Sequence, residues 1–215
     1  MIQRILEKAI QQRLGQGKAL ILFGARQVGK TTMLKNMLRE RDDVLWLNGD
    51  EQDVRSLFEN ASSTMLGAVI GKKKIVVIDE AQRIVNIGLC LKLIIDNIPD
   101  VQVVATGSSS FDLSNMINEP LTGRKIEYWM YPLSFGELVA HNGLLEEKRL
   151  LAHRLVYGSY PDVVNNVGDE KMVLSELADS YLYKDILMFD KIKKSDKLVK
   201  LLQALAFQMG SEVSY

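Results

Sequence analysis

The chain has 215 residues and a mass of 24.2 kDa, enough to bury a large hydrophobic core in one domain or in a domain and a smaller unit. Lys and Arg number 27, as do Asp and Glu, so no global field draws the whole chain to nucleic acid or to an anionic membrane. A single cysteine, Cys90, excludes an internal disulfide and a multi-thiolate zinc site.

The N-terminal segment interleaves charged and apolar residues and so lacks the uninterrupted apolar region of a secretory signal. No apolar run approaches the roughly 18 residues that a membrane span needs. We therefore expect a cytoplasmic protein without a membrane partner.

Apolar residues at spacings of three and four predict an amphipathic helix over residues 2–14. Five short apolar runs follow, most of them separated by stretches with helical spacing: 19–23, 44–47, 75–78, 101–105 and 126–131. This alternation predicts an α/β fold with a largely parallel sheet. Residues 84–98 are apolar on almost every turn and predict a helix covered on two sides.

After Pro132 the spacing is helical only, which predicts helices over 134–140, 146–157, 170–189 and 197–209. The change in pattern places a domain boundary near residue 141.

A glycine-rich motif of the form G-x-x-x-x-G-K-[ST] directly follows the first apolar run and precedes a helical segment. Its glycines let backbone N–H groups turn inward around phosphate oxygens, and the helix points its positive end at the same place. We expect Lys30 to reach the β and γ phosphates of ATP and the Thr31 hydroxyl to bind Mg²⁺. The predicted nucleotide contacts are Gly24, Ala25, Arg26, Gln27, Val28, Gly29, Lys30, Thr31 and Thr32.

The third apolar run ends in two carboxylates, Asp79 and Glu80. Asp79 suits the Mg²⁺ shell of a P-loop nucleotidase. Glu80 suits a general base that polarises water for attack on the γ phosphate. The alternative is a pair of solvated carboxylates at a strand end.

The fourth run leads into Thr106-Gly107-Ser108-Ser109-Ser110. If its strand lies between the first and the third, its end faces the γ phosphate. Ser108, with Thr106 as the weaker candidate, is then expected to hydrogen-bond the attacking water. A serine-rich helix cap before Phe111 is the alternative.

Arg124 stands just before the fifth run, where it could stabilise charge on a phosphoryl group bound to a neighbouring subunit. A surface arginine is the competing interpretation. Basic residues, Arg4 among them, outnumber acidic ones in residues 1–41, which suits a polyphosphate ligand or a solvated helix surface.

Several segments together resemble the prokaryotic AAA+ superfamily ATPases, in the group where an ATPase core precedes a C-terminal domain of unknown function. Besides the P-loop they are VIDEAQ at 77–82, ATGSS at 105–109, LTGR at 121–124, YPLSFGE at 131–137, GSYP at 158–161 and YKDI at 183–186. One departure is Ala25, where the group often has proline.

This resemblance implies a P-loop NTPase sheet of order 5-1-4-3-2 followed by an α-helical lid. It makes Ser108 the sensor, Arg124 an arginine finger and Pro161 a residue that packs near adenine. The implied domains are an AAA+ P-loop core at 1–141, a lid at 142–195, and the start of a truncated winged-helix-like module at 196–215.

The leading hypothesis is an ATPase that uses Mg²⁺ and ATP to drive rearrangement of a partner or of its own C-terminal region, as a homo-oligomer or within one chain. A nucleotide-gated signalling or scaffold module with slow hydrolysis is the second hypothesis, and DNA stays open as a partner. A small-molecule kinase is the third, although no arginine-bearing lid or acceptor pocket is evident.

Overall fold

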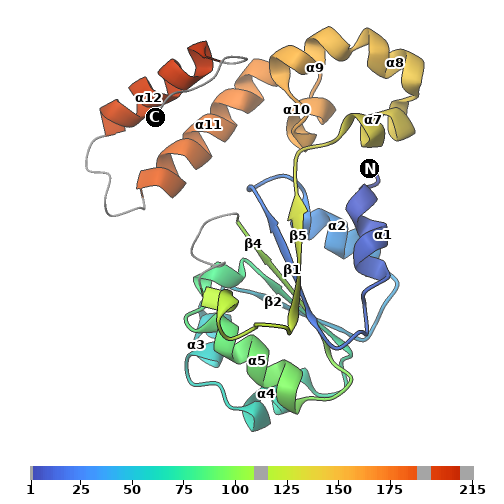
Figure 1. Cartoon of the computed structure of the whole chain (residues 1–215), viewed down its shortest axis with the longest axis vertical. Helices are drawn as coiled ribbons and strands as arrows, with labels where there is room; N and C mark the ends of the chain where they lie inside the picture. Colours follow the sequence, from blue (N-terminus) through green and yellow to red (C-terminus); the bar gives the residue numbers. More distant parts are fainter. Residues whose placement is uncertain (1, 109–115, 188–194, 209–215) are drawn as a thin grey trace. The chain divides into compact units, whose positions relative to one another are not determined.

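The computed structural model describes residues 2–108, 116–187 and 195–208 (Figure 1). The chain divides into two compact units, residues 1–161 and 162–215. The first unit contains the whole sheet, and the second is helical. The three-part division at 141 and 195 stays a prediction.

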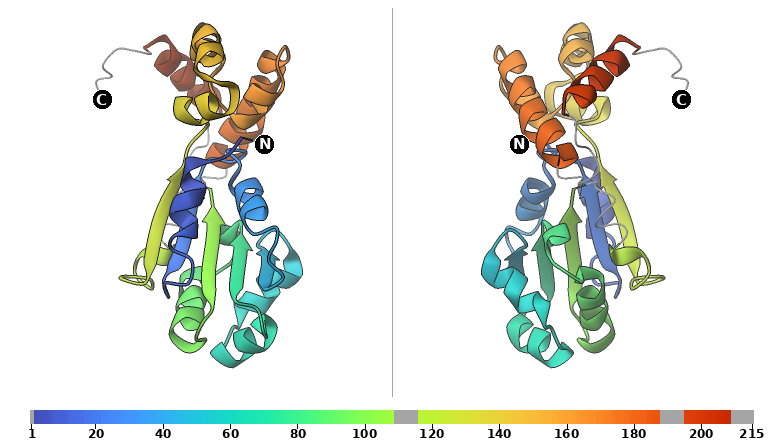
Figure 2. Two further views of the ribbon diagram at one scale, coloured as in Figure 1. Left: turned by 90° about the vertical axis from the view of Figure 1, so that its right-hand side faces the viewer. Right: turned by 90° about the vertical axis from the view of Figure 1, so that its left-hand side faces the viewer.

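Five parallel strands form the sheet of the first unit: β1 (Ala19–Gly24), β2 (Val44–Asn48), β3 (Ile75–Asp79), β4 (Gln102–Gly107) and β5 (Lys125–Met130). Their order is β2-β3-β4-β1-β5, with β5, drawn in yellow, along one edge (Figure 2). This is the predicted order read from the other edge. The α/β fold and its parallel sheet are therefore confirmed.

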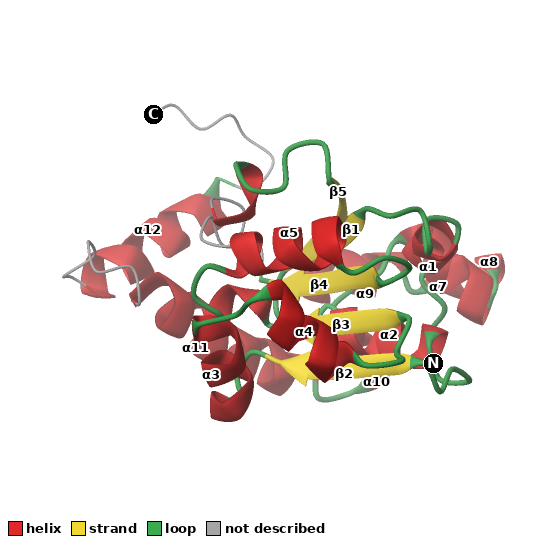
Figure 3. Cartoon of the chain, turned by 90° about the horizontal axis from the view of Figure 1, so that it is seen from below, coloured by secondary structure: helices red, strands yellow, loops and turns green. Residues whose placement is uncertain are grey.

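Helices cover both faces of the sheet (Figure 3). On one face lie α3 (Gln52–Glu59), α4 (Ser63–Ile70) and α5 (Ile87–Asn97); on the other lie α1 (Ile5–Gln11) and α2 (Lys30–Met37). Successive residues of β1 point to opposite faces of the sheet: Ile21 packs in the cluster with α5, and Leu22 packs in the cluster with α2. Since both sides of a central strand are buried, its sequence has no polar alternation.

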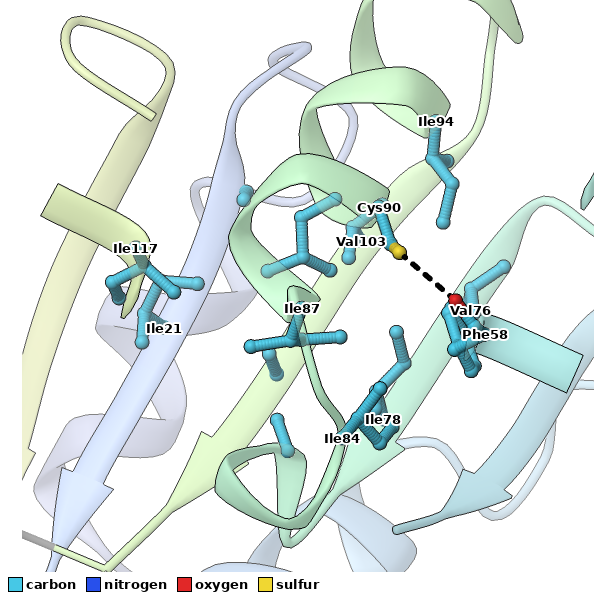
Figure 4. Close-up of a cluster of buried hydrophobic side chains, with 14 of the residues drawn as sticks. Ile21, Phe58, Val76, Ile78, Ile84, Ile87, Cys90, Ile94, Val103 and Ile117 are labelled. Atoms are coloured by element: carbon cyan, nitrogen blue, oxygen red, sulfur yellow. Dashed lines mark hydrogen bonds between the residues drawn. The ribbon is translucent and has the colours of Figure 1, made fainter. Parts of the chain in front are cut away.

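Helix α5 packs on the sheet through Ile87, Cys90 and Ile94, whose spacing of three and four residues puts them on one face (Figure 4). The Cys90 thiol also donates a hydrogen bond to the Phe58 carbonyl at 3.6 Å. Leu89, on the same helix, is 53% exposed. The helix is also covered on a second side, since it packs against α4 and a Cβ at Gly88 would lie 2.2 Å from the Met116 carbonyl oxygen. Solvent meets the remaining face, which carries Leu89.

Three short helices follow the sheet within the first unit: α7 (Phe135–Asn142), α8 (Leu144–Arg149) and α9 (Leu151–Tyr157). The single helix predicted over 146–157 is two, divided at Leu150. A buried carboxylate fastens them, because Glu147 of α8 accepts hydrogen bonds from Arg154 of α9 at 3.1 Å and from Asn142 of α7 at 2.6 Å. The Arg154 hydrogen bond lowers the pKa of Glu147 and keeps it ionised.

The second unit contains α11 (Glu170–Leu187) and α12 (Ser195–Phe207), close to the helices predicted over 170–189 and 197–209. A short helix, α10 (Pro161–Asn165), begins at the last residue of the first unit and was not predicted. Across the described parts of the chain, the helices are too short or too polar to traverse a bilayer.

We predict that Leu91→Ala destabilises the first unit by about 2–5 kcal/mol, because the Leu91 side chain is fully buried between α5 and the sheet. Leu89→Ala is the matched control on the exposed face and should stay within about 0.5 kcal/mol of the wild type. Urea unfolding followed by fluorescence of Trp46 and Trp129 measures both. Equal losses for the two variants would contradict the burial of Leu91 and the exposure of Leu89.

Candidate functional site

Three strands of the first unit bring the predicted site residues together at the carboxyl-terminal ends of the strands. Gly24 ends β1, Asp79 ends β3, and β4 lies between these strands. The register pairs Ile78 with Ala105 and Phe23 with Gly107, so Asp79 stands beside Thr106. The carboxyl ends of parallel strands are where ligands bind in open α/β sheets.

The loop between β1 and α2 has a backbone that depends on its glycines. A Cβ at Gly24 would lie 2.5 Å from the Met130 carbonyl oxygen, so no larger residue fits there. Gly29 has φ of 97°, in the left-handed region that favours glycine. These two constraints explain the motif's spacing: one glycine lets the loop leave β1 beside β5, and the other lets it enter α2.

Lys30, the first residue of α2, turns its side chain back into this loop. Its Nζ donates hydrogen bonds to the carbonyl oxygens of Gly24 at 2.7 Å and Ala25 at 3.0 Å. Burial lowers the pKa of Lys30, and the negative charges of Glu80 and Asp79 oppose that shift. The loop therefore encloses an ammonium group beside two carboxylates, an arrangement suited to an anionic ligand.

A chain of hydroxyl and carboxylate groups links α2, β3 and β4. The Thr31 hydroxyl donates to Asp79 Oδ2 at 2.7 Å, and the Thr106 hydroxyl donates to the other oxygen of Asp79. The backbone N–H of Glu80 donates in turn to the Thr106 hydroxyl at 3.2 Å. Thr106 thus fixes both carboxylate-bearing residues at the end of β3.

Thr106, named as the weaker candidate from the sequence, makes these direct contacts and is fully buried. Ser108 lies half-buried just beyond the end of β4, at the same edge of the sheet. The alternative of a serine helix cap falls on residues 109–111, which lie outside the described residues.

Glu80 has φ of 50°, an uncommon conformation for a residue other than glycine. Its carboxylate accepts a hydrogen bond from the Gln82 side-chain amide at 2.5 Å. Gly49, directly after β2, donates its N–H to the Asp79 carbonyl at 2.8 Å, and a Cβ there would lie 2.4 Å from the Glu80 carbonyl oxygen. Sequence reasoning missed Gly49; its signal is a glycine immediately after a strand that neighbours the Asp79 strand.

Arg124 lies just before β5, at the amino-terminal ends of the strands and so at the other end of the sheet from the candidate site. Its carbonyl accepts from the N–H of Ala19, the first residue of β1, and its Nε donates to Asp96 at 2.7 Å. The length of β1, about 17 Å at 3.3 Å per residue, separates Ala19 from Gly24. Arg124 is therefore remote from the loop of its own chain.

The remaining predicted residues lie in the loop, on α2 and at the start of α10. Arg26 is half-buried, whereas Gln27 and Thr32 are exposed. Pro161 begins α10, and the preceding Tyr160 packs against the buried cluster that includes Val28.

The residues present fit Mg²⁺, which favours oxygen ligands and keeps several waters while sharing substrate phosphates. The Thr31 hydroxyl and Asp79 carboxylate supply two oxygens at one place. Over the described ranges, His, Cys, Asp and Glu form no group of three or more that could hold a metal by themselves. That pattern suits an ion bound together with a phosphate ligand.

An AAA domain model matches residues 16–139, more than half of the chain. The chain belongs to the AAA domain family. A second model, for a domain of unknown function (DUF8612), matches residues 148–215. The resemblance found in the motifs is thereby confirmed for both parts of the chain.

Curated relatives include an uncharacterised protein of Methanocaldococcus jannaschii, 22% identical over 98% of this chain, and one of Haemophilus influenzae, 27% identical over 90%. This chain spans about half of each relative, 51% and 52% of their lengths. Among solved structures, a Walker-type ATPase of Pyrococcus abyssi matches with a TM-score of 0.56 and 19% identity, over 95% of this chain and 76% of that one. This likeness shows a shared fold.

The AAA domain model and the ATPase fold together support nucleotide binding and hydrolysis in general.

We predict that Thr106→Val lowers nucleotide turnover by about 10–100-fold, because a lost hydrogen bond to a charged group is worth about 1.5–3 kcal/mol. Thr106→Ser keeps the hydroxyl and is the matched control. Steady-state phosphate release measures both, and equal activity of the two variants would remove Thr106 from the site.

Proposed function

We propose that this AAA domain binds ATP with Mg²⁺ and hydrolyses it to ADP and phosphate. The observation that carries the proposal is the continuous set of contacts from Thr31 through Asp79 and Thr106 to Glu80, beside the buried Lys30. Hydrolysis of a nucleotide requires groups that bind the phosphates, a divalent cation and the attacking water, all at one place.

In this proposal the loop N–H groups and Lys30 hold the β and γ phosphates. Lys30 exchanges its bonds to the Gly24 and Ala25 carbonyls for bonds to phosphate oxygens. Thr31 and Asp79 hold Mg²⁺, which neutralises charge on the phosphates when bound. Arg26 and Gln27 border the phosphates, while Pro161 lies near the adenine ring.

Glu80 acts as the general base in this proposal. It accepts a proton from a water molecule as that water's oxygen bonds to the γ phosphorus and the bond to the ADP oxygen breaks. Ser108, at the end of β4, hydrogen-bonds the same water. The role of Thr106 is to fix the positions of Asp79 and Glu80 through its hydrogen bonds to both residues.

Turnover would drive rearrangement of a partner or of the C-terminal part of the chain, in the cytoplasm. The proposed division is a core at 1–141, a lid at 142–195 and the start of a winged-helix-like module at 196–215. Phosphate release compared with and without DNA tests whether nucleic acid is a partner.

A second function, a nucleotide-gated signalling module with slow hydrolysis, is favoured by the Gln82 contact. Because the Gln82 amide holds the Glu80 carboxylate, the base is engaged before any water arrives. A Gln82→Leu variant that hydrolyses ATP faster than the wild type would support this function, and an unchanged or lower rate would argue against it.

Two substitutions test the ATPase proposal. Lys30→Ala should abolish ATP binding, since the loop loses its buried cation. Glu80→Gln should leave the Kd for ATP unchanged and lower turnover by about 10²–10⁴-fold, the usual contribution of a general base. Calorimetric ATP binding and phosphate release measure the two effects. Tight binding by Lys30→Ala, or full turnover by Glu80→Gln, would contradict the assigned roles.

The position of Arg124 leads to a separate proposal, that it contacts the nucleotide of a neighbouring subunit in a homo-oligomer. Turnover per chain should then rise with protein concentration, and Arg124→Ala should lower it. Asp96→Ala is the matched control, because it removes the hydrogen-bond partner of Arg124 but keeps the arginine itself. Turnover that is independent of concentration would exclude this role.

A further inference from the structure

Arg4 is a buried arginine that joins three segments of the first unit. It is 8% exposed and precedes α1. Its Nε donates to Glu137 of α7 at 3.0 Å and its Nη1 to the Val28 carbonyl of the loop at 3.1 Å. Its Nη2 donates to the Tyr131 carbonyl after β5. One guanidinium thus spans α7, the glycine-rich loop and the exit of β5.

Glu137 is held as firmly as the arginine. It accepts hydrogen bonds from the N–H groups of Ile5 at 2.9 Å and Ser134 at 2.8 Å, and it completes the capping box that begins α7. Burial alone would raise the pKa of Glu137. The N–H groups of Ser134 and Ile5 and the charge of Arg4 outweigh burial and lower it. The carboxylate therefore stays ionised and keeps the guanidinium against the loop.

The bond to Val28 determines the direction of the next N–H group. In a trans peptide the carbonyl and the following N–H point in opposite directions. With the Val28 carbonyl held by Arg4, the Gly29 N–H points away from Arg4. A charged donor on the carbonyl also polarises the peptide and strengthens the N–H as a donor.

We propose that Arg4 is a positioning residue for phosphate binding, acting through the Val28–Gly29 peptide and anchored by Glu137. The proposal rests on the nucleotide-binding function proposed above. In this proposal Arg4 acts without touching phosphate: it fixes the direction of the Gly29 N–H, whereas Lys30 donates to the Gly24 and Ala25 carbonyls. Sequence reasoning had counted Arg4 only within a local basic excess.

The first unit contains a matched control. Arg154 and Glu147 form another buried ion pair, 9% and 0% exposed, that joins α8 to α9 without a contact to the loop. Removing the cation from either pair leaves a buried carboxylate and destabilises the fold. Only the Arg4 pair should affect nucleotide affinity.

The test compares Arg4→Met, Arg4→Lys and Arg154→Met for the Kd of ATP and for thermal unfolding without nucleotide. Arg4→Met should raise the Kd about tenfold, the cost of one charged hydrogen bond. Arg154→Met should lower the unfolding midpoint and leave the Kd within about twofold of the wild type.

Arg4→Lys separates positioning from stability and keeps the test valid if Arg4→Met does not fold. Lysine retains the charge beside Glu137, but its single ammonium cannot reproduce the planar fork that reaches three acceptors. We expect the unfolding midpoint to recover more than the Kd does, with the KM for ATP raised more than kcat is lowered.

Two outcomes would overturn the inference. One is a wild-type Kd in Arg4→Lys and Arg4→Met; the other is an equal loss of affinity in Arg4→Met and Arg154→Met. Failure of the underlying function is distinguishable, because the wild type itself would then bind no ATP.

Discussion

The parallel pairing of β3, β4 and β1 is the constraint on which the candidate site depends. It puts the carboxyl ends of three strands at one edge, so the loop after Gly24, the Asp79 carboxylate and the Thr106 hydroxyl meet without any long connection. The parallel pairing of β5 with β1 puts Arg124, which precedes β5, at the amino-terminal end of the strands. One topological fact thus gathers the phosphate-binding groups and separates the arginine from them.

Two cations bind carbonyl groups of the glycine-rich loop. Lys30 donates to the Gly24 and Ala25 carbonyls, whereas Arg4 donates to the Val28 carbonyl. The Arg4 bond makes the Gly29 N–H face away from Arg4. In the proposed complex Lys30 exchanges its carbonyl partners for phosphate oxygens, so the Arg4 contact is the one that persists when the anion is bound. The glycines give the loop its conformational freedom, and Arg4 restricts that freedom at the Val28–Gly29 peptide.

The sequence predicts strands and loop well because their signals are local. Strands buried on both faces read as continuous apolar runs, and the motif from Gly24 to Thr31 carries its own spacing. Helix boundaries are weaker: no Gly or Pro marks the division at Leu150. Contacts between distant residues are not readable at all, as Arg4 and Glu137 stand 133 positions apart. Likewise, two hydroxyl residues close in sequence, Thr106 and Ser108, become distinguishable only once the end of β4 at Gly107 is known.

The burial of Cys90 gives the first unit a built-in chemical reporter. The thiol is 4% exposed, and burial raises its pKa, so the folded state offers a thiol reagent neither access nor thiolate. Modification must wait until α5 separates from the sheet and the bond to the Phe58 carbonyl breaks. Because the chain has one cysteine, the labelling rate reports a single opening event. Where closing is faster than labelling, the rate measures the free energy of separating α5 from the sheet without any engineered probe.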